Sequence, residues 1–166
     1  MDICETYSDR KLFCNDWEFY KAAFGSDYSE DFAFKPVDIP HDWLIYDTND
    51  LYETSTGWYR KNFSYQKKEG IRTFIRFDGV YMDSKVYVNG ALAGEWKYGY
   101  SAFMFDITDL VKEGENIITV RVDHHAPNSR WEQAFSERFG FAKALRYALA
   151  MTAFISPHQS RRTAGR

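Results

Sequence analysis

The sequence predicts an all-β protein, and three observations support this prediction. Aromatic residues, which favour strands, make up 19% of the 166 residues. Short stretches rich in β-branched and aromatic residues recur at intervals of about 8–12 residues, with turn signals between them. The dipeptide Asn89-Gly90, a strong hairpin signal, separates two of these stretches. Together these features are typical of a β-sandwich or a barrel.

The longest expected strand is Thr56–Tyr65. Its alternation places Trp58 and Arg60 on one face, and the opposite face carries Tyr59, Lys61 and Phe63. Four further strands are expected at Ile71–Phe77, Lys85–Val88, Leu92–Trp96 and Asn116–Asp123. Between the last two, Ile107–Val111 is expected to form a single helical turn.

Length and charge exclude several classes of function. The 166 residues correspond to about one domain. They fall short of the roughly 250 residues of a (β/α)8 barrel, so the chain alone does not provide a function that needs one. The net charge of −3 argues against nucleic acid and against an anionic membrane as partners. Met1–Glu5 lacks a signal-peptide pattern and no apolar run approaches a membrane span, so we expect a cytoplasmic protein.

No metal or cofactor is expected. Cys4 and Cys14 are expected to be free thiols, and they lack the partners of a four-ligand zinc site. His124 and His125 are adjacent at the end of a strand, where neighbouring side chains point to opposite faces. The sequence contains no phosphate-binding loop and no dinucleotide-binding motif.

The composition changes near Trp131. Residues 1–131 contain 15 basic and 22 acidic residues, a net charge of −7, whereas residues 132–166 contain 6 and 2, a net charge of +4. Alanine occurs seven times in each part, although the second part has only 35 residues. Within it, Phe141–Phe154 is rich in helix-forming residues, and a helix there is expected to end before Pro157. We expect His158–Arg166 to be disordered.

Four motifs occur in order along about 115 residues: Asp38–Trp43 (DIPHDW), Gly57–Lys61 (GWYRK), Phe77–Gly90 (FDGVYMDSKVYVNG) and Pro127–Trp131 (PNSRW). From Trp17 to Trp131 the chain therefore resembles the N-terminal sugar-binding domain of glycoside hydrolase family 2, which includes β-galactosidases, β-glucuronidases and β-mannosidases. The resemblance implies a galactose-binding-like jelly-roll β-sandwich for residues 1–131. The PHDW form is most similar to β-galactosidase-type members and implies a β-galactoside or similar carbohydrate as partner.

In such a sandwich most motif residues serve the core and its turns. Phe77, Val86 and Val88 are expected to point inward, with Asn89-Gly90 as a type I′ turn. Core or turn positions are likewise expected for Gly57, Trp58, Gly79 and Gly90.

The resemblance also implies where the chemistry lies. Family 2 enzymes are retaining glycosidases that use two Glu residues about 5 Å apart. In the family both lie in a C-terminal barrel, and no acidic residue here falls in a matching motif. We therefore assign no catalytic residue and expect the chain alone to be inactive. The alternatives are a free-standing carbohydrate-binding module and an interaction sandwich without a sugar role. A surface that packs against a barrel in the family is expected to promote self-association here.

Two loops carry the candidate sugar-binding residues, which are His41, Asp42, Trp43, Asn128, Arg130 and Trp131. Asp42 can accept and Arg130 donate hydrogen bonds to hydroxyl groups, and an indole can stack on a sugar. The structural alternative places Trp43 in the core, Asp42 as a turn cap and Arg130 in an ion pair. Ser129 stands where some β-galactosidases have an acidic residue near sodium, so that role is not implied.

The segment after Trp131 departs from the family, in which a Gly-rich stretch and an aromatic-Arg pair usually follow. Here the chain continues with Glu132–Glu137 (EQAFSE). If translation is shifted to start from the last base of the Trp131 codon, degenerate codons allow Gly-Ala-Gly-Val-Phe-Arg. We therefore expect residues 132–166 to be an out-of-frame tail. The alternative is a native C-terminal helix.

Overall fold

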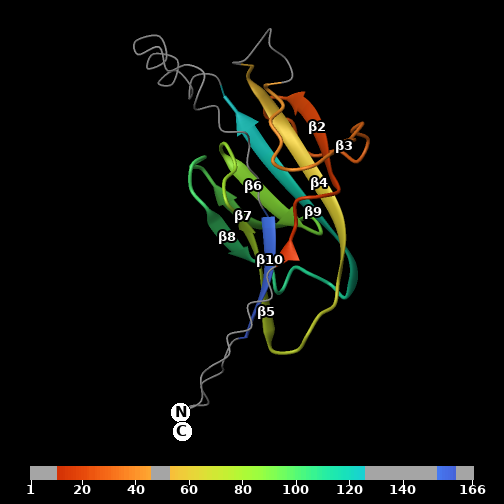
Figure 1. Cartoon of the computed structure of the whole chain (residues 1–166). Coiled ribbons are helices and arrows are strands. Elements are labelled where there is room, and N and C mark those ends of the chain that lie inside the picture. The colour runs from red at the N-terminus through yellow and green to blue at the C-terminus, as the bar shows by residue number, and fades with distance from the viewer. Residues whose placement is uncertain (1–10, 46–52, 126–152, 160–166) are drawn as a thin grey trace.

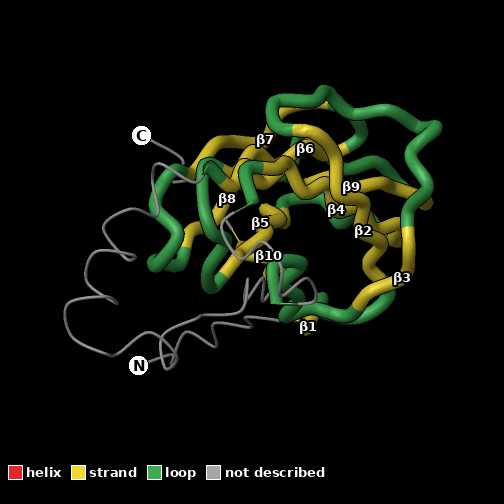
Figure 2. The backbone as a smooth tube through the Cα atoms, turned by 90° about the horizontal axis from the view of Figure 1, so that it is seen from above, coloured by secondary structure: helices red, strands yellow, loops and turns green. Residues whose placement is uncertain are grey.

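A computed structural model of the chain describes residues 11–45 and 53–125 in full and residues 153–159 as backbone. All regular elements of these segments are strands, and no helix that could cross a membrane occurs among them. The strands form two sheets that face each other, as Figure 1 and Figure 2 show. The predicted all-β sandwich is confirmed.

The larger sheet has six strands in the order β3-β2-β4-β9-β6-β7. Their bounds are Lys35–Val37 (β3), Trp17–Ala23 (β2), Ser55–Tyr65 (β4), Gly114–His124 (β9), Ser84–Val88 (β6) and Ala91–Trp96 (β7). The smaller sheet has four strands in the order β1-β10-β5-β8. Their bounds are Lys11–Leu12 (β1), Ala153–Gln159 (β10), Ile71–Phe77 (β5) and Phe103–Asp106 (β8). All neighbouring strands are antiparallel.

The core lies between the sheets and follows the predicted alternation. In β4, Tyr59, Lys61 and Phe63 are buried on the inner face. The inward positions of Phe77, Val86 and Val88 are confirmed, since each is 0% exposed. The five strands expected from the pattern appear within two residues of their expected bounds. Buried residues of both sheets form a single core.

The hairpin between β6 and β7 has the expected turn. Asn89 and Gly90 have φ angles of 51° and 82°, the positive values that a type I′ turn requires at both central positions. The Asn89 side chain also donates to the Leu110 carbonyl oxygen and accepts from the Ile117 amide, at 2.8 and 3.1 Å. The Ile107–Val111 turn is confirmed, because the amides of Leu110 and Val111 both donate to the Ile107 carbonyl oxygen at 3.0 Å.

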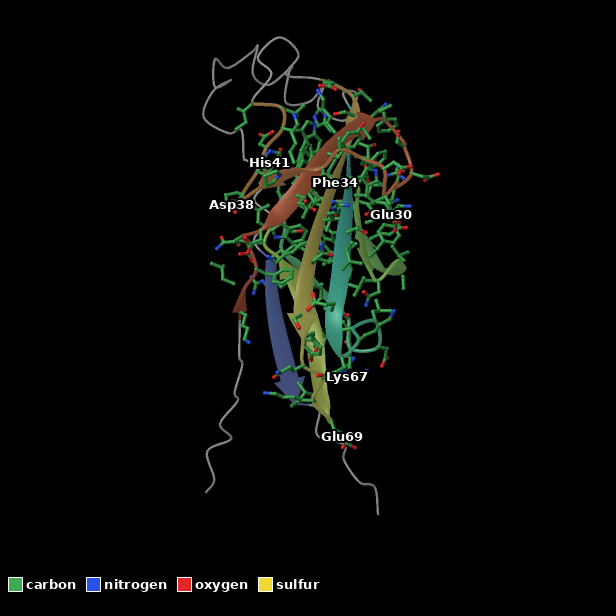
Figure 3. All side chains as sticks on the ribbon, turned by 90° about the vertical axis from the view of Figure 1, so that its right-hand side faces the viewer. Glu30, Phe34, Asp38, His41, Lys67 and Glu69 are labelled. Carbon is green, nitrogen blue, oxygen red and sulfur yellow. The ribbon has the colours of Figure 1, made fainter. Side chains whose placement is uncertain are left out.

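The β2–β3 connection covers the outer face of the six-stranded sheet at β4. The Trp58 ring is only 3% exposed, since Tyr28 packs edge-on against it at 5.4 Å between ring centroids. The Arg60 guanidinium lies 4.0 Å above the Phe34 ring and pairs with Glu18. Trp58 and Arg60 thus share the face opposite to Tyr59, as predicted. Figure 3 shows His41 and Phe34 on opposite sides of β2.

The expectation for the end of the chain is wrong where the structure describes it. Ala153–Gln159 forms strand β10, although a helix was expected to reach Phe154 and disorder to begin at His158. β10 pairs with all seven residues of β5, from Ala153–Phe77 to Gln159–Ile71. The open edge of β5 overrides the local helix preference of the segment. The rest of the predicted helix, 141–152, lies outside the described residues.

Candidate functional site

The loop with the first three candidate residues follows β3 and lies over the inner face of β2 and β4. It contains a cis peptide bond between Ile39 and Pro40. Ile39 is buried, and its amide donates to the Cys14 carbonyl oxygen at 3.0 Å. These contacts fix the backbone directly before His41, in the upper part of the view in Figure 3, far from Lys67 and Glu69.

Trp43 is a core residue. Its indole is 5% exposed, stacks on Phe19 at 5.4 Å between ring centroids, and donates from Nε1 to Ser55 Oγ at 3.0 Å. A Cβ atom at Gly57 would lie 2.8 Å from the Trp43 ring, so only glycine leaves room for it. The alternative that Trp43 is a core residue is therefore correct. Its ring has no open face on which a sugar could stack.

His41 is half-buried against the hydroxyl of a fully buried tyrosine. Its Nδ1 lies 2.9 Å from Tyr59 Oη, and its ring packs on Phe19 at 4.7 Å between centroids. Burial lowers the pKa of His41 below 6.5, although the nearby Asp42 charge opposes this shift. Burial, reinforced by Asp42, raises the pKa of Tyr59 well above 10. At neutral pH the pair is uncharged, which suits hydrogen bonding better than proton transfer.

Asp42 caps the turn that contains it. Its Oδ1 accepts a hydrogen bond from the Leu44 amide at 2.9 Å, as a side chain in an Asx turn does. Asp42 is only half-buried, so the residue keeps some surface that a ligand can reach. The expected structural role and the expected binding role of Asp42 are therefore compatible.

The second candidate loop, with Asn128, Arg130 and Trp131, lies outside the described residues. The chain reaches it from His125, at the end of the sandwich where β2 ends, β4 begins and β9 ends (Figure 1). We call this the Ser55 end, because Ser55 pairs there with Ala23 and with His124. Trp43 binds Ser55 at the same end, so the structure places the first loop beside the point where the chain leaves toward the second.

The two adjacent histidines have separate surroundings. His124 is 4% exposed, and its Nδ1 lies 2.5 Å from the Glu53 carbonyl oxygen. The His125 ring packs on Phe24 at 5.0 Å between centroids. Within residues 11–45 and 53–125, no group of three or more His, Cys, Asp or Glu side chains could hold a metal ion.

The sequence analysis missed a chain of aromatic side chains at the Ser55 end. Ring centroids lie 5.8 Å apart between Tyr98 and Tyr100, 5.5 Å between Tyr100 and Tyr81, and 6.0 Å between Tyr81 and His124. Tyr98 and Tyr100 are 62% and 45% exposed. The available signal was Tyr98-Gly99-Tyr100 itself, two aromatic residues around a glycine directly after an expected strand.

Comparisons with known proteins agree with this architecture. Residues 25–139 match the family model described as "Glycosyl hydrolases family 2, sugar binding domain". A beta-galactosidase of Bacteroides ovatus is 39% identical over 74% of the chain, and a beta-glucuronidase of Bacteroides fragilis is 37% identical over 68%. A solved glycosyl hydrolase family 2 member from Bacteroides cellulosilyticus superposes on 89% of the chain with a TM-score of 0.66 and 26% identity. The chain spans 16% of the length of each of the two relatives and 20% of the solved chain.

Proposed function

Because the chain belongs to glycosyl hydrolase family 2 through its sugar-binding domain, we propose that it acts as the sugar-binding part of a larger β-glycosidase. The match itself carries this proposal, since it is confined to that domain and covers about one sixth of relatives that are named beta-galactosidase and beta-glucuronidase. Retaining hydrolysis needs two carboxyl groups about 5 Å apart. We assign neither to this chain, and its partner is the part of the enzyme that supplies them.

The proposed ligand is a β-galactoside. The PHDW form of the motif at Pro40–Trp43 supports this choice, and a relative named beta-galactosidase has 39% identity to the chain. Asp42 accepts hydrogen bonds from sugar hydroxyl groups, the uncharged His41 adds a further polar contact, and Trp43 supports both from behind. Arg130 and Trp131 complete the proposed site from the second loop.

Binding and hydrolysis are tested together on the purified chain. We expect chemical-shift changes in a ¹H–¹⁵N NMR titration with methyl β-D-galactopyranoside and no release of nitrophenol from an aryl β-galactoside above a mock preparation. Asp42→Asn keeps an acceptor for the Leu44 amide and removes the charge, so it weakens binding without loss of the turn. Measured turnover, or a spectrum unchanged at saturating sugar, would contradict the proposal.

Three further expectations belong to the same proposal. The protein acts in the cytoplasm, and its strands follow a jelly-roll path. The third expectation is self-association.

Self-association is expected to occur through exposed apolar side chains. Leu12 and Met104, which are 66% and 54% exposed, support this expectation. Sedimentation at several concentrations tests it, because a constant monomer mass would exclude self-association.

We also propose that residues 132–166 are translated out of frame. The change in composition and charge at Trp131 supports this, together with the codons that permit a family-like continuation. Two observations favour a native tail instead: the family match extends to residue 139, and β10 pairs with β5. The coding DNA decides between them: a second frame that lacks Gly-Ala-Gly-aromatic-Arg would make the tail native.

A further inference from the structure

The aromatic chain at the Ser55 end contains two exposed tyrosine side chains, Tyr98 at 62% and Tyr100 at 45%. Tyr98 and Tyr100 lie in the connection between β7 and β8. Tyr81 supports Tyr100 from the connection between β5 and β6, and His124 supports Tyr81 from the end of β9. We call Tyr81, Tyr98 and Tyr100 the tyrosine rim. None of its members belongs to the His41 loop.

The tyrosine rim is held in place by its own loop. A Cβ atom at Gly99 would lie 2.4 Å from the Tyr81 ring, so the backbone between the two exposed tyrosines rests directly on that ring. The indole of Trp96 donates to Ser101 Oγ at 3.2 Å and closes the base of the loop. Rings that are ordered before a ligand arrives lose little conformational freedom when it binds.

The chemistry of the tyrosine rim fits a sugar better than an aliphatic partner. A tyrosine ring offers an apolar face and a hydroxyl tip, and a pyranose offers an apolar C–H face edged by hydroxyl groups. The exposed apolar side chains elsewhere in the described segments include the aliphatic Leu12, Leu92 and Met104, which have no such polar tip.

The angle between the two exposed rings and the charges nearby indicate which class of sugar fits the tyrosine rim. Tyr98 and Tyr100 meet at 65°, so they form a corner in which one ring can stack on a sugar and the other can contact its edge. The charged residues next to the rim have opposite signs. Lys97 is exposed directly before Tyr98, and the half-buried Asp83 lies opposite it, with the Asp83 amide 3.5 Å from the Lys97 carbonyl oxygen. This environment favours an uncharged pyranose.

We propose that the tyrosine rim is a second carbohydrate-contacting surface, in which Tyr98 stacks on the C–H face of a neutral pyranose and Tyr100 contacts its edge. The proposal rests on the proposed sugar-binding function and adds residues outside the candidate loops. It predicts that the Ser55 end contacts carbohydrate at two places, the His41 loop and the tyrosine rim.

The test is an NMR titration of the full chain with methyl β-D-galactopyranoside, and with methyl β-D-glucuronide as the charged counterpart. Tyr98→Ala is expected to weaken galactoside binding about tenfold, because the ring face is lost. Tyr98→Phe keeps that face and is expected to stay within about threefold of the unchanged protein. Leu92→Ala, which removes an exposed apolar side chain on β7, is the control and is expected to leave galactoside binding unchanged.

The outcomes separate the two proposals. If the unchanged chain binds neither sugar, the sugar-binding function and the tyrosine rim both fail. If it binds galactoside and Tyr98→Ala binds equally well, only the rim proposal is overturned. The rim proposal is also overturned if Asp42→Asn abolishes binding while the double variant Tyr98→Ala, Tyr100→Ala still binds galactoside. It is overturned as well if the double variant changes only the sedimentation mass, because the rim is then a protein interface.

Discussion

The two sheets of this sandwich differ in how their strands are encoded. In the six-stranded sheet, β4 and β9 pair over eleven residues, and both show the alternation that predicts a half-buried strand. In the four-stranded sheet, β5 is equally clear, but its neighbour β10 comes from the alanine-rich, basic part of the chain. The strands β4, β9, β6 and β7 of the larger sheet are specified by local pattern, whereas the smaller sheet is completed by a segment without such a pattern at the open edge of β5.

Pro157 shows how such a segment can be tolerated. Proline lacks an amide hydrogen and is confined to positions where a strand has an open edge. Within the described residues, β1 pairs only with Phe154 and Ile155 of β10, so the described partner of Pro157 lies on the β5 side. The proline that was expected to end a helix therefore lies inside a strand.

The largest expected effect tests whether both sheets share one core. Ile75 on β5 and Ile118 on β9 are both 0% exposed. Truncation of either to alanine is expected to lower the free energy of unfolding by about 2–5 kcal/mol, from lost burial and the cavity left behind. Urea denaturation of the two variants measures this. A loss below about 1 kcal/mol for Ile75→Ala alone would mean that the four-stranded sheet does not cover the core.

A smaller effect tests the place of β10. Ile155 pairs with Lys11 on one side and with Ile75 on the other, so Ile155→Pro removes a ladder hydrogen bond inside the sheet. We expect a loss of roughly 2–3 kcal/mol in urea denaturation. Pro157→Ala is the control and is expected to be nearly neutral. If Ile155→Pro is as stable as the unchanged protein, β10 does not contribute to the stability of the fold.

The sequence predicted those elements whose signal is local. The strands near 55–65, 71–77, 84–88, 91–96 and 114–124 combine alternation with turn residues, and both are visible in a short window. β2 was missed because its outer face is also covered by aromatic residues, with Tyr20 stacked on Phe32 at 4.4 Å, so apolar residues do not alternate. β3 and β8 have only three and four residues.

The candidate site was predictable in part for the same reason. The turn at Asp42 is local, and its cap was foreseen as an alternative. The burial of Trp43 depends on Gly57, fourteen residues away, which leaves space for the indole. In the tyrosine rim, Tyr81 of the β5–β6 connection contacts Tyr100 of the β7–β8 connection and also His124 at the end of β9, and only strand pairing brings these residues together. Long-range contacts of this kind leave no signal in a single window.

A third, smaller effect concerns the hairpin that the sequence predicted best. Asn89 combines a positive φ with hydrogen bonds to Leu110, Asn116 and Ile117. Asn89→Gly keeps the turn and loses those bonds, at an expected cost of about 1–2 kcal/mol. Asn89→Ala is expected to cost about 1 kcal/mol more, because alanine strains at positive φ. Equal thermal unfolding of the two variants would show that the turn conformation is unimportant.

The smallest expected effect is a pH dependence of stability that differs between the two sheets. Burial lowers the pKa of His41, whose loop packs on the six-stranded sheet, below 6.5. Burial pushes the pKa of Asp106 on β8 upward, but hydrogen bonds from Thr108 and Arg72 outweigh it and hold the pKa below 3.8. In both cases the unfolded chain binds protons more readily, so stability falls as the pH falls from the unfolded pKa through the folded one.

The two losses therefore occupy different pH windows. Protonation of His41 is expected to reduce stability as the pH falls below 6.5. Protonation of Asp106 is expected to reduce it only as the pH falls below 3.8. Urea midpoints measured between pH 8 and about pH 3 should show two steps. His41→Gln should remove the step near neutral pH alone, and Asp106→Asn only the acidic one. If His41→Gln leaves the upper step in place, another group causes that step, and burial against Tyr59 does not hold the His41 imidazole uncharged.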